Sequence, residues 1–211
     1  MLKIKDIHFF VTKNGKCYIK EWLQKLDIQI RGRINNRLVR LEYGVYGDYK
    51  HIKDNLYELR FFFGKGYRIY FLEKDNKIIL LLNAGDKGTQ SRDIKKAQEI
   101  IDILELENDY MEKFTNYLRE QLENKAEVTE YVNAALEQYF LDRNKELFLS
   151  TLKEAIIASG GITKMSKDIH INRQHIYKIL SSKGNPSFDN IGSLLTALGL
   201  QLKVESQPHH L

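Results

Sequence analysis

Cysteine is nearly absent from this sequence: Cys17 is the one example among 211 residues, so no disulfide can form within a chain. Neither Cys17 nor the histidines occur at the spacings that hold zinc, so we expect no metal and no cofactor. Long hydrophobic runs are also missing, since none approaches the ~20 residues that a membrane-spanning helix needs. The first five residues lack the apolar core of a signal peptide, so we expect a cytoplasmic protein with no membrane partner.

Charge is distributed unevenly along the sequence. Residues 1–106 contain 21 lysines and arginines against 14 acidic residues, and residues 107–157 contain 6 against 11. Residues 158–211 are basic again, with 6 against 3. These differences are either random drift in surface charge or a sign of partners. In the second case each basic block binds a polyanion, and the acidic block binds the first basic block.

The hydrophobic pattern of the first half predicts an α+β domain over residues 1–106. Apolar residues form strand-like runs in four segments: 4–10, 56–63, 67–73 and 77–83. They recur at helical spacing in three segments: 18–26, 30–41 and 91–104. The last three strands are separated by the turn signals Gly64-Lys65-Gly66 and Lys74-Asp75-Asn76, so the sheet should be mostly antiparallel.

The second half, residues 107–211, is predicted to be an all-α domain that follows the short acidic segment 105–109. Helices are expected at 110–124, 127–141, 145–158, 162–169, 173–181 and 188–198. One further strand is a possible element at 200–204. The boundary near 106 rests on a change of hydrophobic period as well as on composition.

Two arginines interrupt strands that otherwise have the composition of a core. Arg60 and Arg68 either pair with Glu58 or another acid, or converge on the sheet surface to bind phosphate, which suits the guanidinium fork. Lys87 follows the last strand by a short loop, so it should reach the same surface unless it pairs with Asp86. The phosphate hypothesis requires Arg68 to lie near the other two cations and outside a buried ion pair.

Three motifs around these cations carry a family resemblance: ELR at 58–60, GYRIYF at 66–71 and GDKGTQ at 85–90. With them, residues 1–104 resemble the phage-derived branch of the RelE/HigB toxins, often named addiction-module killer proteins. The resemblance implies a metal-independent endoribonuclease that cuts mRNA on the ribosome, with the 2′-hydroxyl attacking the adjacent phosphodiester. It also places the family's essential arginine at Arg68, and two further cationic positions at Arg60 and Lys87.

The resemblance leaves the general acid open, because the best-known branch uses a tyrosine where this sequence has Ser91-Arg92-Asp93. The candidates are Tyr67, Tyr70, Lys87 and Asp93. Lys50 and His51 are either RNA contacts or solvated residues. The same two interpretations apply to the arginine-rich helix that contains Arg37.

Residues 159–203 have the layout of a helix-turn-helix DNA-binding domain, with a helical hairpin that binds no DNA as the alternative. Asn172 is a good N-cap for the second helix, and Ile176, Ile179 and Leu180 form its apolar stripe. The opposite face carries residues expected at base edges, namely Arg173, Gln174, Tyr177 and Lys178. Phosphate contacts are expected from Lys164, Ser181 and Lys183.

The segments TEYVNAALEQYF, ELFLSTLKEAIIASGG and INRQHIYKILSSKGNPSF resemble the HigA-like antitoxins over about 112–203. The resemblance implies that helices at about 110–158 neutralise the toxin, and that the chain binds operator DNA as a homodimer. We therefore expect a nuclease that is autoinhibited in cis or in a swapped dimer, since a short tether gives an effective concentration of order mM, and that represses its own promoter. The alternatives are a DNA-binding regulator with an inert toxin-like scaffold, and a constitutive nuclease that has lost DNA binding.

Overall fold

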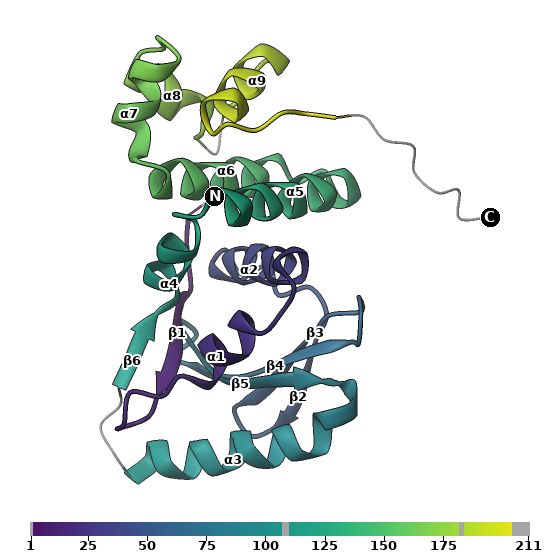
Figure 1. Cartoon of the computed structure of the whole chain (residues 1–211). Helices are drawn as coiled ribbons and strands as arrows, with labels where there is room; N and C mark the ends of the chain where they lie inside the picture. The colour runs from purple at the N-terminus through teal and green to yellow at the C-terminus, as the bar shows by residue number, and fades with distance from the viewer. Residues whose placement is uncertain (1, 107–109, 182–183, 204–211) are drawn as a thin grey trace, which may run out of the picture. The chain divides into compact units, whose positions relative to one another are not determined.

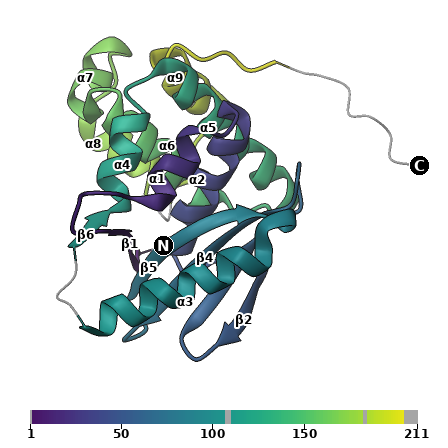
Figure 2. The same ribbon diagram turned by 60° about the horizontal axis from the view of Figure 1, so that its bottom comes forward.

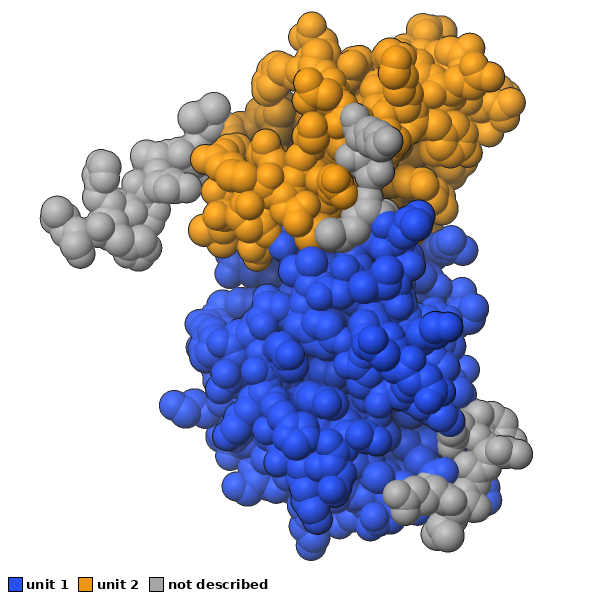
Figure 3. All heavy atoms as spheres, turned by 180° about the vertical axis from the view of Figure 1, so that it is seen from behind, with its two compact units in different colours: residues 1–121 blue, residues 122–211 orange. Residues whose placement is uncertain are grey.

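The computed structural model describes residues 2–106, 110–181 and 184–203. The chain forms two compact units, unit 1 at residues 1–121 and unit 2 at residues 122–211, which Figure 3 shows in different colours. In the described residues, no helix combines the length and the apolar character that a membrane crossing needs.

Unit 1 is built on a six-stranded sheet in the order β2-β3-β4-β5-β1-β6. Its strands are β1 (Asp6–Val11), β2 (Tyr49–Lys53), β3 (Leu56–Arg60), β4 (Tyr67–Lys74), β5 (Ile78–Asp86) and β6 (Tyr110–Lys113). Neighbouring strands are antiparallel except for β1 and β5, which are parallel. The sheet is therefore mixed, because β1 is inserted between β5 and β6.

Helices cover both faces of this sheet (Figures 1 and 2). One face carries α1 (Tyr18–Gln24) and α2 (Ile28–Glu42), and the other carries α3 (Gln90–Leu106). Apolar residues of the strands and of α3 form a buried cluster that includes Phe10, Tyr70, Leu80, Leu82 and Ala97. The short 3-10 turn η1 (Lys87–Thr89) connects β5 to α3 at the end of the sheet where the motif residues lie.

The last elements of unit 1 are β6 and α4 (Phe114–Gln121), which the sequence assigned to the second domain. β6 pairs antiparallel with β1 in the register Phe9↔Glu112. Phe114 and Tyr117 are fully buried, and their ring centroids lie 6.0 and 5.3 Å from that of Phe9. The compact unit 1 therefore runs to Gln121, and residues 110–113 form a strand where a helix was predicted.

Unit 2 is helical in its described residues. Its helices are α5 (Lys125–Asp142), α6 (Lys145–Ala158), α7 (Gly161–Asp168), α8 (Arg173–Ile179) and α9 (Phe188–Ala197). Ala135, Phe148 and Leu149 form a buried cluster between α5 and α6. Residues 200–203 form no strand, in contrast to the sequence expectation.

Candidate nucleic-acid interfaces

The three predicted cations of unit 1 lie at one end of the sheet. Arg60 and Arg68 are directly opposite each other in the register of β3 and β4. Lys87 follows the end of β5, where a Cβ built on Gly66 would lie 3.6 Å from the Lys87 Cβ and 3.8 Å from the Arg68 Nη1. The hairpin register and the turn after β5 therefore bring all three motif cations together.

Arg68, however, is held in a buried ion pair with Glu58, which is the first of the two interpretations from the sequence and does not meet the requirement of the phosphate hypothesis. Its Nε lies 3.1 Å from the Glu58 carboxylate, and the two side chains are only 12% and 1% exposed. Its Nη1 donates to the Gly66 carbonyl at 2.9 Å. Among the described residues the Nη2 atom has no hydrogen-bond or ion-pair partner.

Glu58 is itself held from two sides. The Tyr70 hydroxyl donates to it at 3.1 Å, and the Gln90 side-chain amide donates at 2.9 Å. This network spans β3, β4 and the first residue of α3, and it fixes the carboxylate against Arg68.

The other two cations differ in their partners. Arg60 Nε forms an ion pair with the Asp48 carboxylate at 2.5 Å. Lys87 is exposed, and no carboxylate of the described residues lies within ion-pair distance of it. Asp86 does not pair with Lys87 but caps η1 by accepting from the Gly88 N–H at 2.8 Å. Lys87 is therefore the cation of this group whose charge is least compensated locally.

Most of the candidate general acids are withdrawn from solvent. Tyr70 is fully buried, and burial followed by the Glu58 charge raises its pKa far above the usual range. Asp93 is buried and accepts a hydrogen bond from the Thr89 hydroxyl. Tyr67 is buried against Trp22, with a ring-centroid distance of 6.0 Å. These positions do not suit a proton donor to bound RNA, because such a donor must reach the substrate; Lys87 is the candidate that remains exposed.

The predicted RNA contact Arg37 has a structural role instead. Its Nε donates to the Tyr46 carbonyl at 2.7 Å, and its Nη2 donates to the Asp48 carbonyl at 3.4 Å. Burial, followed by the charge of Arg40, lowers its pKa. A Cβ at Gly47 would clash with the guanidinium, so glycine permits this close approach. Arg37 therefore holds the loop before β2, and its role as an RNA contact stays a prediction.

Lys50 and His51 lie on the edge strand β2, which the sequence placed before the sheet. Both side chains are exposed. The His51 Nε2 lies within hydrogen-bond distance of the Asp54 carbonyl, at 2.6 Å. Their exposure is compatible with either interpretation from the sequence, RNA contact or solvated surface.

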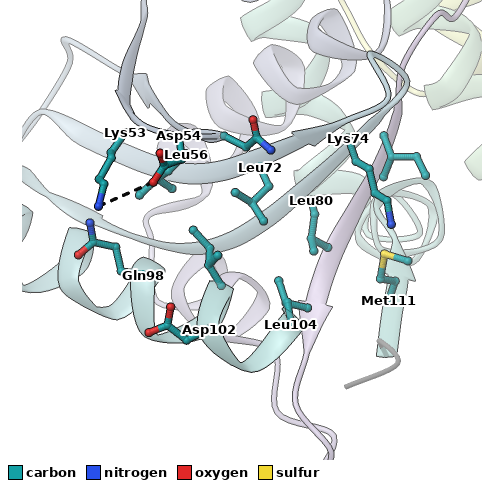
Figure 4. Close-up of a pocket in the computed structure, with 13 residues that line it drawn as sticks. Lys53, Asp54, Leu56, Leu72, Lys74, Leu80, Gln98, Asp102, Leu104 and Met111 are labelled. Atoms are coloured by element: carbon teal, nitrogen blue, oxygen red, sulfur yellow. Dashed lines mark ion pairs between the residues drawn. The ribbon is translucent and has the colours of Figure 1, made fainter. Parts of the chain in front are cut away.

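An apolar hollow of about 700 Å³ lies between α3 and the sheet (Figure 4). Leu56, Leu72, Leu80 and Leu104 line it, and charged residues such as Lys53 and Asp102 border it. None of the predicted site residues lines the hollow. Lys74, which lines the hollow at the end of β4, lies six residues from Arg68. At ~3.3 Å per strand residue this is about 20 Å, so the hollow and the cation cluster are separate.

The predicted DNA-reading helix of unit 2 has the expected division of faces. Ile176, Ile179 and Leu180 are buried. The predicted base-contact residues Arg173, Gln174, Tyr177 and Lys178 are all exposed. The Asn172 side chain accepts from the Gln174 N–H at 2.8 Å, which confirms it as the N-cap of α8. One face of the helix is therefore available to a partner.

The predicted phosphate contacts lie around this helix. Lys164 is exposed on α7, and the half-buried Ser181 donates to the Lys178 carbonyl at 2.8 Å. Lys183 lies outside the described residues. In the described part of the chain, no group of three or more histidine, cysteine or acidic side chains is arranged to hold a metal ion.

These features define a two-part protein, an α/β domain with clustered cations followed by a helical domain with an exposed polar helix face. Residues 21–105 match the model of the phage-derived Gp49-like protein family, and residues 111–206 match that of the probable addiction module antidote proteins. The chain belongs to these families, with a Gp49-like toxin domain in its first half and an antidote domain in its second. The two matches together point to a toxin–antitoxin module in one polypeptide.

Two uncharacterised proteins of Haemophilus influenzae are similar to the chain. One is 42% identical over 78 residues, which are 36% of this chain and 79% of that protein. The other is 34% identical over 86 residues, which are 41% of this chain and 84% of that protein. No solved structure gives a significant match.

Proposed function

We propose that unit 1 is a metal-independent endoribonuclease of mRNA, that the antidote half restrains it, and that the antidote half also represses transcription by binding operator DNA. The observation that carries the link between the halves is the position of residues 110–121, here named the antidote arm. Almost all of the arm lies in the antidote match, which begins at 111, yet it forms β6 and α4 of unit 1.

The antidote arm has the properties of a strong intramolecular contact. Its strand adds to the open edge of β1, where main-chain hydrogen bonds provide affinity. Its helix buries Phe114, Tyr117 and Leu118, and Glu112 forms an ion pair with Lys20 of α1. Because the antidote arm is covalently joined to the rest of the antidote half, these contacts would anchor that half to unit 1.

The proposed chemistry depends on orientation and charge, because the nucleophile is the 2′-hydroxyl of the substrate itself. Lys87 would stabilise the negative charge that develops on the attacked phosphate, and one such donor is worth about 10²–10³ in rate. Lys87 would also protonate the leaving 5′-oxygen, since it is the exposed candidate acid.

The proposed operator contact uses the exposed face of α8. Arg173 and Gln174 lie in the first turn of the helix, where side chains reach base edges when a recognition helix enters the major groove. Lys164 on α7 would contact phosphate. A homodimer would place two such helices ~34 Å apart on successive half-sites.

Inducible expression of residues 1–121 and of the full chain tests the nuclease. We expect 1–121 to arrest growth and cleave mRNA, and the full chain to do neither. Lys87→Ala should relieve both effects in 1–121, whereas Lys25→Ala, which removes an exposed lysine at the end of α1, should not. A folded 1–121 fragment that is harmless at full expression would refute the nuclease.

The alternative function is a DNA-binding regulator with an inert toxin-like scaffold. It is favoured by the pairing of both arginines with carboxylates, Arg60 with Asp48 and Arg68 with Glu58. In that case a fragment of the chain's own promoter would be shifted by the full chain, while 1–121 would leave RNA intact. Salt concentration must be fixed, because phosphate contacts make binding depend on it.

A further inference from the structure

The hairpin between β3 and β4 exposes one aromatic ring in a run of three phenylalanines. Phe62 is 76% exposed, whereas Phe61 is buried and Phe63 is half-buried. The ring centroid of Phe63 lies 5.8 Å from that of Phe61 and 5.8 Å from that of Tyr67. The two flanking rings are thus anchored in the domain, and the middle ring faces solvent.

The backbone around Phe62 is fixed by the turn. The Phe61 N–H donates to the Tyr67 carbonyl at 2.9 Å, and the Gly66 N–H donates to the Phe63 carbonyl at 3.1 Å. Gly64 and Gly66 have φ of +56° and +73°, in the left-handed region that glycine adopts without strain. Phe62 is therefore presented on an ordered hairpin in the exposed position described above.

The exposed ring adjoins the cation cluster. The Arg60 guanidinium carbon lies 5.9 Å from the centroid of the Phe62 ring. Arg60 is opposite Arg68 across the two strands, and Lys87, the first residue of η1, borders Gly66 of the hairpin turn. An exposed aromatic ring with cations close to it is the combination by which proteins bind single-stranded nucleic acids, with bases stacked on rings and phosphates on cations.

We propose that Phe62 is a stacking platform for one unpaired base of RNA, with Arg60 and Lys87 against the neighbouring phosphates. This inference rests on the proposed function and deepens it by naming the substrate as single-stranded RNA with an unstacked base at the cleavage site. An aromatic face accepts any base, so the platform contributes affinity and position without strong sequence preference. The surrounding cations favour this polyanionic occupant over an apolar protein surface.

Equilibrium binding to the full chain tests the platform. The probes are a short 2′-O-methyl RNA, which has no nucleophile for cleavage, and an abasic oligonucleotide with the same number of phosphates. We expect Phe62→Ala to weaken RNA binding about tenfold, within the range of one lost stacking contact, and to leave abasic binding unchanged. Phe62→Trp should retain RNA binding.

Phe140→Ala is the matched control. Phe140 is 58% exposed, and the Arg143 guanidinium carbon lies 5.3 Å from the centroid of its ring, but it belongs to α5 of unit 2. This substitution should change neither affinity. Equal affinities of Phe62→Ala and the parent chain for RNA, equal losses on RNA and abasic probe, or no RNA binding by the parent chain would overturn the platform. Base-dependent binding by a chain whose unit 1 cleaves nothing would instead refute the nuclease and leave the platform intact.

Discussion

Shortening the chain to residues 1–106, where the sequence places the domain boundary, removes β6 and α4 from unit 1. We expect this fragment to be much less stable than residues 1–121. Phe114, Tyr117 and Leu118 are 0, 0 and 1% exposed, and burial of each such side chain contributes about 1.5–3 kcal/mol. Their joint loss removes roughly 5–9 kcal/mol, against a total free energy of unfolding of about 5–15 kcal/mol for a typical domain.

Urea unfolding of the two fragments measures this difference. Trp22 is the one tryptophan and lies in α1, so its fluorescence and the circular dichroism of the helices report on the same unit. At an m-value of about 1–3 kcal/mol per M, the midpoint of 1–106 should fall by about 2 M or more, or its cooperative transition should disappear. Leu118→Ala in 1–121 should give an intermediate loss of about 2–5 kcal/mol.

Equal urea midpoints for 1–106 and 1–121 would show that the antidote arm contributes nothing to the fold, and the reasoning from burial would be wrong. The comparison also matters for the growth assay. A harmless 1–106 fragment would report the loss of β6 and α4 rather than the absence of a nuclease. Residues 1–121 are therefore the fragment on which the nuclease proposal should be judged.

Three further outcomes follow from the described contacts. Tyr70→Phe removes a buried hydroxyl that donates to Glu58, so the free energy of unfolding should fall by about 1–3 kcal/mol. RNA cleavage by 1–121 should persist. Loss of cleavage in a folded variant would instead identify Tyr70 as the general acid. Burial raises the pKa of Glu73, but hydrogen bonds from Lys5 and Tyr46 outweigh it and lower the pKa below its usual 4.5. This stabilisation is present above pH 4.5 and is lost as the pH falls through the lowered pKa. In urea titrations, acidification should therefore lower the free energy of unfolding of the parent chain more than that of Glu73→Gln. Parallel pH profiles of stability for the two proteins would contradict this assignment. Arg173→Ala should weaken binding to the chain's own promoter by about 5–100-fold relative to unrelated DNA, whereas Lys164→Ala should weaken both alike; gel-shift titrations at one salt concentration distinguish these results.

Much of the fold was predictable because most strands and helices bury one face. β4 and β5 have runs of apolar residues bounded by turn signals, and they appear in the structure near the predicted positions. β2 was missed because four of its five residues are exposed, so it has no hydrophobic period. β6 was missed because its four residues lie directly before a helix and are too short to show a period.

The site was predictable in its location but not in its pairing. The hairpin turn at Gly64–Gly66 fixes the register of β3 against β4, so the meeting of Arg60 and Arg68 follows from local sequence. The partner of Arg60 is Asp48, which lies before β2 and reaches the arginine only through the folded sheet. Phe62 was missed because three consecutive phenylalanines do not reveal which ring faces solvent.

Strand pairing between β1 and β6 determines where the chain must be cut to release the toxin half. A single protease cut between residues 106 and 110 would yield two polypeptides that remain paired through β1 and β6. The aromatic side chains of α4 would still be buried in the core of the other fragment. Separation requires scission beyond Gln121. The liberated product would then keep a piece of its former antidote as a permanent part of its own architecture.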